Sequence, residues 1–167
     1  MAGSGSKMKL EVNMQGKIGG WQTRRRARLF CRRIIHDLIQ EREFSFLKKK
    51  REIAFAVVMV SRRKSLALNR GFRKKSKPTN ILSFPVYQTS AELRAAFSPD
   101  VQLGDIVVCP EVIRKEARQA GREFYAQFFW MMLHGILHLL GCDHERGARE
   151  RARMEMLENQ ILRRFHS

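Results

Sequence analysis

The chain has 167 residues, which is enough for one globular domain with a substantial core and too few for two. Hydrophobic residues make up 44% of it, and this share excludes wholesale disorder. The net charge of +17, from 33 Lys and Arg against 16 Asp and Glu, favours a polyanionic partner such as nucleic acid over a merely solvated basic surface.

Three scattered cysteines, Cys31, Cys109 and Cys142, form no CxxC pair. Neither a disulfide framework nor a thiolate zinc site is therefore predicted, and a reducing, cytoplasmic compartment is expected. The N-terminal MAGSGSKMKLEV lacks the apolar stretch of a secretory signal. Residues 1–6, with their GSGS, are typical of an added linker, so we leave them out of the fold prediction.

Strands and basic helices alternate in the first half of the predicted fold. A short strand is expected at Lys9–Asn13, and a β-branched, aromatic strand at 53–60. Between them, residues 23–40 carry apolar side chains at steps of three and four, which predicts an amphipathic helix with an arginine-rich exposed side. Residues 61–72 are expected to form a shorter helix, followed by a basic loop at 73–80.

The second half begins with ILSFP, residues 81–85, a brief predicted strand whose final proline suggests a sheet edge or a strand end. Residues 87–101 are polar and mixed, and we expect a loop there. LGDIVVC, residues 103–109, predicts another strand. Pro110 is well placed to open a helix that ends near Ala120.

The most apolar segment, FYAQFFWMMLHGILHLLG at residues 124–141, has nearly the length of a membrane span, and a helix is predicted over 123–140. It carries Gln127, His134 and His138, however, and polar groups are costly inside a bilayer. A central helix that is buried on all sides explains the same composition. We therefore predict a buried helix and keep the membrane span as the second interpretation.

A last amphipathic helix is predicted at 150–165. The whole pattern comprises about four strands and four to five helices, without repeats or a linker between domains. Strands and helices mixed in this order predict a single α+β domain over residues 1–167, in which helices cover a small mixed sheet.

Three of the five histidines fall within HGILHLLGCDH, residues 134–144. His134 and His138 are four apart, so a helix would present both imidazoles to one metal ion. Gly141 can adopt the left-handed conformation that ends a helix, and His144 could then return as a third ligand. Such a set fits one zinc ion per chain, or another divalent metal, and leaves a coordination position open, as in catalytic sites. The alternative is a group of core histidines bonded to backbone carbonyls.

The neighbours of these histidines leave other roles open. Cys142 and Asp143 are candidates for a fourth ligand or for residues that support the ligands, although a purely structural Cys142 is favoured. Zinc peptidases with two helical histidines carry a Glu after the first, as the general base. Here that position is Gly135, so a metallopeptidase remains only a weak alternative.

Three segments of the chain match family motifs: LNRGFRKKSKPTNILSFP (residues 68–85), LGDIVVCPE (103–111) and HGILHLLGCDH. They resemble, in the same order, the L-N-x-x-x-R…P-T-[DN]-V-L-S-F-P, L-G-D-I-x-I and H-G-x-L-H-L-x-G-x-D-H motifs of the YbeY family of bacterial rRNA-maturation endoribonucleases. With the expected elements upstream, the resemblance covers nearly the whole chain. One departure is Ser76, where many members have Asp.

The resemblance implies an α+β fold with a zinc-type metal at the end of a cleft. Carried over onto this chain, the metal ligands are His134, His138 and His144, and the arginine of the cleft is Arg73. Asp105, in the LGD strand, matches another characteristic polar position and is expected to bind substrate.

The basic run Arg62–Lys77 suits RNA binding independently of the resemblance. Eight of its sixteen residues are basic. We predict that Lys74 and Lys77 bind substrate through backbone phosphates, while a solvated loop is the alternative for most of the run. The Arg73 guanidinium could stabilise negative charge on a phosphate in the transition state.

The implied activity is that of a metal-dependent, single-strand-specific endoribonuclease in ribosomal RNA maturation and small-subunit quality control. The expected partners are RNA, chiefly rRNA of the small subunit, with ribosomal proteins and ribosome-assembly GTPases, and no membrane. A different class of function remains open: an RNA-binding factor for ribosome assembly whose metal is structural.

Overall fold

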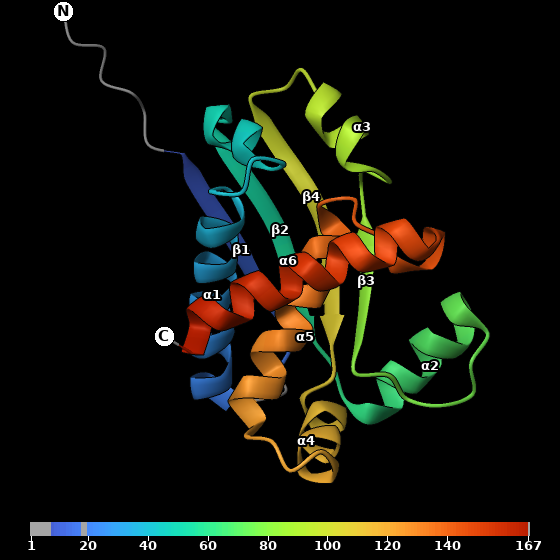
Figure 1. Cartoon of the computed structure of the whole chain (residues 1–167). Coiled ribbons are helices and arrows are strands. Elements are labelled where there is room, and N and C mark those ends of the chain that lie inside the picture. Colours follow the sequence, from blue (N-terminus) through green and yellow to red (C-terminus); the bar gives the residue numbers. More distant parts are fainter. Residues whose placement is uncertain (1–7, 18–19, 167) are drawn as a thin grey trace, which may run out of the picture.

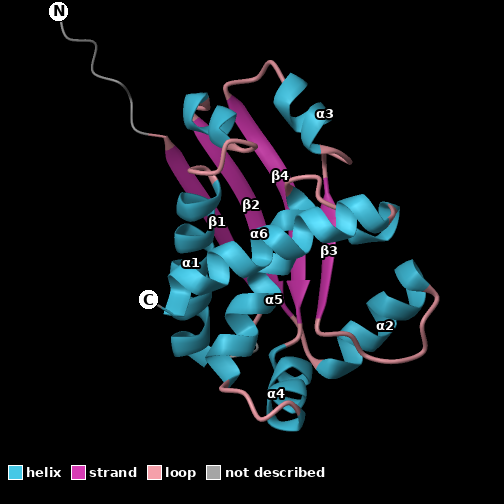
Figure 2. Ribbon diagram, viewed as in Figure 1, coloured by secondary structure: helices cyan, strands magenta, loops and turns pink. Residues whose placement is uncertain are grey.

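The computed structural model of the chain describes residues 8–17 and 20–166, so the linker expected at 1–6 lies outside the described residues. The strands are β1 (Lys9–Gln15), β2 (Glu52–Met59), β3 (Ile81–Pro85) and β4 (Asp100–Val108). They form one sheet in the order β1-β2-β4-β3, as Figures 1 and 2 show. β1, β2 and β4 run parallel, and β3 pairs antiparallel with β4 at one edge. The predicted mixed sheet, with ILSFP at its edge, is confirmed.

Helices lie around this sheet. They are α1 (Gly20–Leu38), α2 (Arg62–Arg73), α3 (Ser90–Ala95), α4 (Pro110–Gln119), α5 (Phe124–Leu139) and α6 (Ala148–His166), with short 3-10 helices η1 (Ser45–Lys49) and η2 (His144–Arg146). α5 is central, because it contacts β3 and β4 as well as α1, α4 and α6. In Figure 1, α6 crosses over α5 on the side away from the sheet. The α+β class is confirmed.

The segment 87–101, expected to be a loop, contains the short helix α3, and β4 begins at Asp100 rather than at 103. Two interactions explain the helix. The Thr89 side chain caps it by accepting a hydrogen bond of 3.1 Å from the backbone N–H of Glu92. Leu93 is fully buried and anchors it to the core. One buried side chain in six residues gives no readable helical period, so the sequence pattern did not reveal α3.

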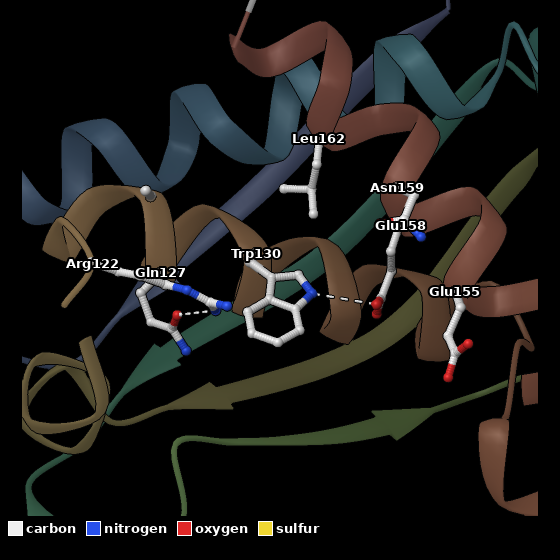
Figure 3. A pocket seen from close by; sticks show the side chains of 8 residues that line it. Arg122, Gln127, Trp130, Glu155, Glu158, Asn159 and Leu162 are labelled. Atoms are coloured by element: carbon white, nitrogen blue, oxygen red, sulfur yellow. Dashed lines mark hydrogen bonds between the residues drawn. The ribbon is translucent and has the colours of Figure 1, made fainter. Parts of the chain in front are cut away.

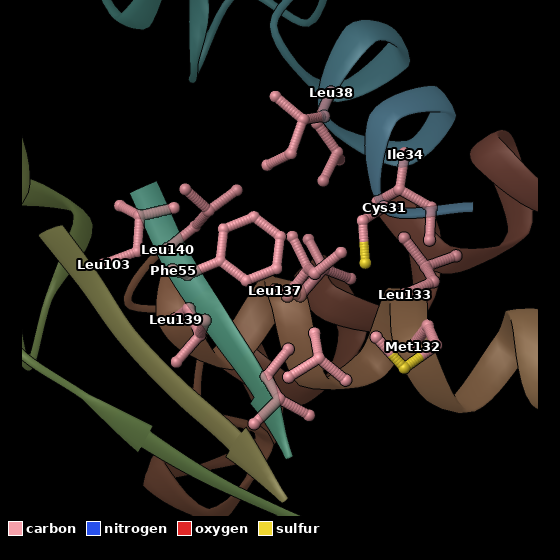
Figure 4. Packing of buried hydrophobic residues seen from close by; sticks show 14 of the residues in the cluster. Cys31, Ile34, Leu38, Phe55, Leu103, Met132, Leu133, Leu137, Leu139 and Leu140 are labelled. Carbon is pink, nitrogen blue, oxygen red and sulfur yellow. The ribbon is translucent and has the colours of Figure 1, made fainter. Parts of the chain in front are cut away.

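The core lies between the sheet and the helices α1 and α5. Figure 4 shows Ile34 and Leu38 of α1 facing Phe55 of β2 and Leu137 of α5. Ile34, Leu38 and Leu137 are completely buried, and each such side chain contributes about 1.5–3 kcal/mol of transfer free energy. This packing accounts for the apolar composition of α5. Among the helices that the structure describes, none has both the length and the hydropathy to cross a membrane.

One stripe of α5 is less buried than the rest. Trp130, His134 and His138 follow one another at steps of four and are half-buried, whereas Leu133, Ile136 and Leu137 are completely enclosed. The fold therefore leaves open the one face of its central helix that carries the two histidines.

Candidate active site

The three histidines of the HGILHLLGCDH segment converge at the end of α5. His134 Nε2 and His138 Nε2 are 3.2 Å apart, and the ring centroids of all three imidazoles are separated by 4.8–5.1 Å. One nitrogen from each histidine lies within 4.8 Å of the other two. The histidines thus form a group that could hold a metal ion.

His144 reaches this group through the turn that ends α5. Gly141 has φ 84°, the left-handed conformation expected from the sequence. A Cβ at Gly141 would lie 2.2 Å from the carbonyl carbon of Thr89, so only glycine fits. The Asp143 carboxylate accepts a hydrogen bond of 2.9 Å from the Glu145 backbone N–H and pairs with Arg146 at 3.2 Å. These contacts hold η2, and with it His144.

Two properties of the histidine group fit a metal ion. Burial, followed by the neighbouring imidazoles of His134 and His144, lowers the pKa of His138 to about 4. His138 is therefore neutral at neutral pH, as a metal ligand must be. The buried Nδ1 of His144 has no hydrogen-bond partner among the described residues. A buried imidazole nitrogen without a partner is costly and points to a ligand beyond the protein's own atoms.

The first histidine is supported by Glu158, a residue that no sequence motif indicates. Oε1 of Glu158 lies 2.7 Å from Nδ1 of His134, and Oε2 accepts a hydrogen bond of 3.3 Å from Nε1 of Trp130. A carboxylate that accepts the Nδ1–H of a histidine leaves the lone pair of Nε2 available to a metal ion and fixes the ring orientation. Glu158 stands in α6, 24 residues after His134, in a helix rich in charged residues. Only its burial, at 9% exposure, distinguishes it from its acidic neighbours.

Cys142 lies inside the core rather than at the metal group. It is 2% exposed, and burial raises the pKa of its thiol to about 12. The thiolate that metal binding requires is therefore disfavoured. Among the described residues, the metal-binding group contains the three histidines and neither Cys142 nor Asp143.

A cavity of about 290 Å³ opens over the histidines, and Arg73 lines it. The other residues that line this metal cavity are Asn80, Ile81, Ser83, Trp130, Met131, His134, His138 and His144. Arg73 is the last residue of α2, and its positive charge is one of the causes that lower the pKa of His138. The structure therefore brings Arg73 and the three histidines, distant in sequence, to one cavity.

A second hollow of about 450 Å³, here called the basic groove, adjoins the metal cavity and shares Arg73 and Asn80 with it. Its cationic side chains are Arg62, Arg73, Lys75, Lys77 and Lys115. Within the described chain, none of these five cations forms an ion pair with an acidic side chain. Such a concentration of unpaired positive charge in a hollow suits a phosphate backbone.

Of the two lysines predicted to bind substrate, only one lines the basic groove. Lys77 lines the basic groove, but Lys74 does not. Lys74 ends α2 in a left-handed conformation, φ 58°, and its Nζ donates to the carbonyl of Gly71 at 3.0 Å. Lys115 was not predicted from the sequence, because it belongs to α4 and lines the groove only through tertiary packing.

Asp105 points away from the metal cavity. Its neighbour Ile106 faces α5, since Cδ1 of Ile106 lies 3.3 Å from where a Cβ of Gly135 would be. Successive side chains of a strand point to opposite faces of the sheet, so the exposed Asp105 lies on the face away from α5. Any contact of Asp105 with substrate would be made outside the metal cavity.

Gly135 has a steric reason to be glycine. A Cβ there would lie 2.7 Å from Cδ1 of Ile81, because α5 packs closely on the sheet at this point. A Glu in this position would be directed into the sheet rather than toward the histidines. The arrangement of zinc peptidases, with a general base after the first helical histidine, is thus excluded by packing as well as by sequence.

The site combines three imidazoles that could hold a metal ion, a guanidinium that lines the same cavity and a cationic groove beside it. On an α+β fold, these features define a metal-dependent hydrolase site with room for an anionic substrate.

Comparison with known proteins gives the particular family. The sequence model of the family described as "Endoribonuclease YbeY" matches residues 22–166, so the chain belongs to the YbeY endoribonuclease family. Enzymes of this class hydrolyse phosphodiester bonds within RNA, so RNA is the substrate class. The resemblance inferred from the three sequence motifs is confirmed.

Individual relatives agree with this assignment. "Endoribonuclease YbeY" of Bartonella bacilliformis is 45% identical over 98 residues, which span 59% of this chain and 59% of that protein. The proteins of the same name from Legionella pneumophila (strain Corby) and Stenotrophomonas maltophilia (strain K279a) are 38% and 39% identical, each over 68% of its own length and over 68% and 67% of this chain. The solution structure of TM1509 from Thermotoga maritima has a similar fold, with TM-score 0.55 and 23% identity over 90% of this chain and 86% of that chain.

Proposed function

We propose that this chain is a zinc-dependent endoribonuclease that cleaves single-stranded RNA during maturation and quality control of small-subunit ribosomal RNA. The observation that carries the proposal is the shared cavity of Arg73 and the three histidines, which opens into the basic groove. The whole chain, residues 1–167, would act as one catalytic domain.

Arg73 and the histidines have separate tasks in this proposal. Phosphodiester cleavage places negative charge on the non-bridging oxygens in the transition state, and the planar guanidinium of Arg73 can stabilise it with two donors. When bound, a metal ion would polarise the phosphate and lower the pKa of a water molecule. His134, His138 and His144 would hold the ion as neutral nitrogen donors, and Glu158 would keep the His134 ring oriented. Three nitrogen ligands favour zinc, with one ion per chain.

The RNA backbone would enter along the basic groove. Lys75, Lys77 and Lys115 would bind phosphates beside the scissile one. Arg73 lines both hollows, so it would contact the backbone where it passes from the groove into the metal cavity. Lys74 and Asp105 lie outside this path. Any contact that they make with RNA would involve nucleotides farther from the scissile phosphate. The family resemblance supports rRNA of the small subunit as the substrate, in the cytoplasm, with ribosomal proteins and assembly GTPases as partners.

The alternative function, an assembly factor with a structural metal, fits the site less well. Structural zinc sites close the coordination shell with four protein ligands. Here the described residues supply three, and a cavity of about 290 Å³ adjoins them. An open position beside a hollow is the arrangement of a catalytic metal.

The test is cleavage of a defined small-subunit rRNA precursor, with metal content measured on the same protein. We expect cleavage to stop when a chelator removes the metal and to return when zinc is restored. His138→Ala should contain almost no zinc and should not cleave, because two imidazoles rarely hold zinc tightly. Cleavage that survives complete metal removal would refute the proposed mechanism.

A further inference from the structure

A third hollow, the α5–α6 cavity, adjoins the metal cavity and shares none of its lining residues with the basic groove. Its volume is about 370 Å³, within the range of small-ligand sites. α6 contributes Glu155, Asn159 and Leu162, which share one helix face at steps of three and four. Figure 3 shows the Trp130 indole between Glu158 of α6 and the pair formed by Arg122 and Gln127.

This hollow is directly connected to the metal site. Trp130 lines both the α5–α6 cavity and the metal cavity. The Glu158 carboxylate joins the two as well, because one of its oxygens bonds Trp130 and the other bonds the metal-site residue His134. A nucleotide next to the scissile phosphate is therefore within reach of the α5–α6 cavity.

The charge of the cavity does not favour a phosphate. Arg122 contributes one positive charge, and Glu155 and Glu158 contribute two negative charges, so the lining sums to −1. The basic groove holds five cations and one acidic residue, Glu116. The two hollows beside the metal thus differ in kind: one attracts a phosphate backbone, and the other favours a neutral ligand.

The polar groups of the cavity match the edges and faces of a nucleobase. Glu155 and Asn159 are exposed at the rim of the cavity, and within the part of the chain that the structure describes neither side chain has a hydrogen-bond partner. Asn, Glu and Arg side chains are the groups that read base edges. The indole of Trp130 offers an aromatic surface, and the Arg122 guanidinium lies 5.1 Å from its ring centre. Aromatic and guanidinium planes are the surfaces on which unpaired bases stack.

We propose that the α5–α6 cavity binds the nucleobase of the nucleotide adjacent to the scissile phosphate. This inference rests on the proposed function for its substrate, and it adds a subsite that would select among bases. The RNA strand would keep its phosphates in the basic groove and turn one base into the α5–α6 cavity. Trp130 and Asn159 would contact that base.

The experiment is a titration of the full-length chain with AMP, GMP, CMP and UMP, followed by tryptophan fluorescence. At least one nucleotide should quench the fluorescence saturably, because a base would contact Trp130. Ribose 5-phosphate is the matched control, since it has the sugar and phosphate without the base, and it should leave the fluorescence unchanged. Trp130→Phe, which leaves Trp21 as the remaining tryptophan, should abolish the quenching.

A matched pair of variants locates the binding site. Asn159→Ala should weaken nucleotide binding by about five-fold, the effect of one lost hydrogen bond. Asn13→Ala, at an exposed position of β1, should bind like the parent. In cleavage assays, Asn159→Ala should also change the relative rates on poly(A), poly(C) and poly(U), whereas Asn13→Ala should not.

The outcomes separate this proposal from the proposed nuclease function. Nucleoside monophosphates contain no internucleotide bond, so the titration does not depend on cleavage. Equal quenching by ribose 5-phosphate, or undiminished nucleotide affinity in Asn159→Ala, would overturn the base subsite even if the chain cleaves RNA. Base-dependent quenching at Trp130 in a chain without nuclease activity would uphold the cavity and refute the nuclease.

Discussion

Glu158→Gln tests whether a carboxylate outside the histidine segment sets the affinity of the metal site. The substitution keeps the size and shape of the side chain and removes its charge. In the parent protein, Oε1 of Glu158 lies 2.7 Å from Nδ1 of His134, a charge-assisted hydrogen bond at a residue that is 9% exposed. An amide can still accept the Nδ1–H, but it stabilises the bound imidazole less and can turn its NH₂ toward the ring.

The expected loss follows from the role of such partners in metal sites. Replacing a carboxylate that orients a metal-binding histidine typically weakens metal affinity about 10- to 100-fold. Since a factor of ten corresponds to roughly 1.4 kcal/mol, Glu158→Gln should cost about 1.4–2.8 kcal/mol of zinc-binding free energy. Competition with a chelator of known affinity measures this value without any assay of activity.

Glu123→Gln is the matched control, because Glu123 is exposed at the start of α5 and its side chain makes no capping hydrogen bond. It should bind zinc like the parent protein. Thermal unfolding of the metal-free proteins should show that Glu158→Gln still folds. If Glu158→Gln is folded and binds zinc as tightly as the parent, the carboxylate does not orient His134 and our account of the site is wrong.

Three further predictions concern the substrate and the turn that carries His144. Arg73→Lys should cleave RNA about two to three orders of magnitude more slowly, because lysine keeps the charge but lacks the planar pair of donors, while RNA affinity changes little. Parent-like cleavage rates in single-turnover assays would show that Arg73 is one more phosphate-binding charge. Affinity for single-stranded RNA, measured across a salt series, should fall by about 0.7 log units per log unit of salt for each phosphate bound in the basic groove, and a salt-independent affinity would exclude the groove. Gly141→Ala should destabilise the fold by more than about 1 kcal/mol, because its backbone is left-handed and the added methyl meets Thr89. Calorimetry should show a lower melting temperature for Gly141→Ala, and chelator competition should show weaker zinc binding. An unchanged melting temperature would mean that the turn accommodates the added methyl group without cost.

Several features of this protein could be predicted from sequence because they depend on local geometry. The spacing of His134 and His138 places both on one face of any helix, whatever the helix packs against. Gly141 is the residue best suited to the left-handed turn that returns His144, and the structure contains that turn. The strands and the buried helix were predictable from runs of apolar and β-branched residues, within a few residues at each end.

Other features depended on which elements became neighbours. The side of the sheet to which Asp105 points follows from the packing of α5 on Ile106, and the matching motif carries no such information. Lys115 lines the basic groove because residues of α4 face it together with residues of α2 and of the loop at 74–80. Lys74 belongs to the basic run, but its side chain bonds back to Gly71 and does not line the groove.

The sequence by itself was enough to identify the three histidines, the arginine and the family to which the chain belongs. Helical periodicity and short motifs depend only on the order of residues along the chain. Tertiary structure decided what surrounds them. Glu158 meets His134 only because α6 crosses α5, and the same crossing forms the cavity beside Trp130. A carboxylate in a charged helix looks like any other until packing removes it from water, since burial and hydrogen bonding, rather than residue type, make it a partner of the metal site.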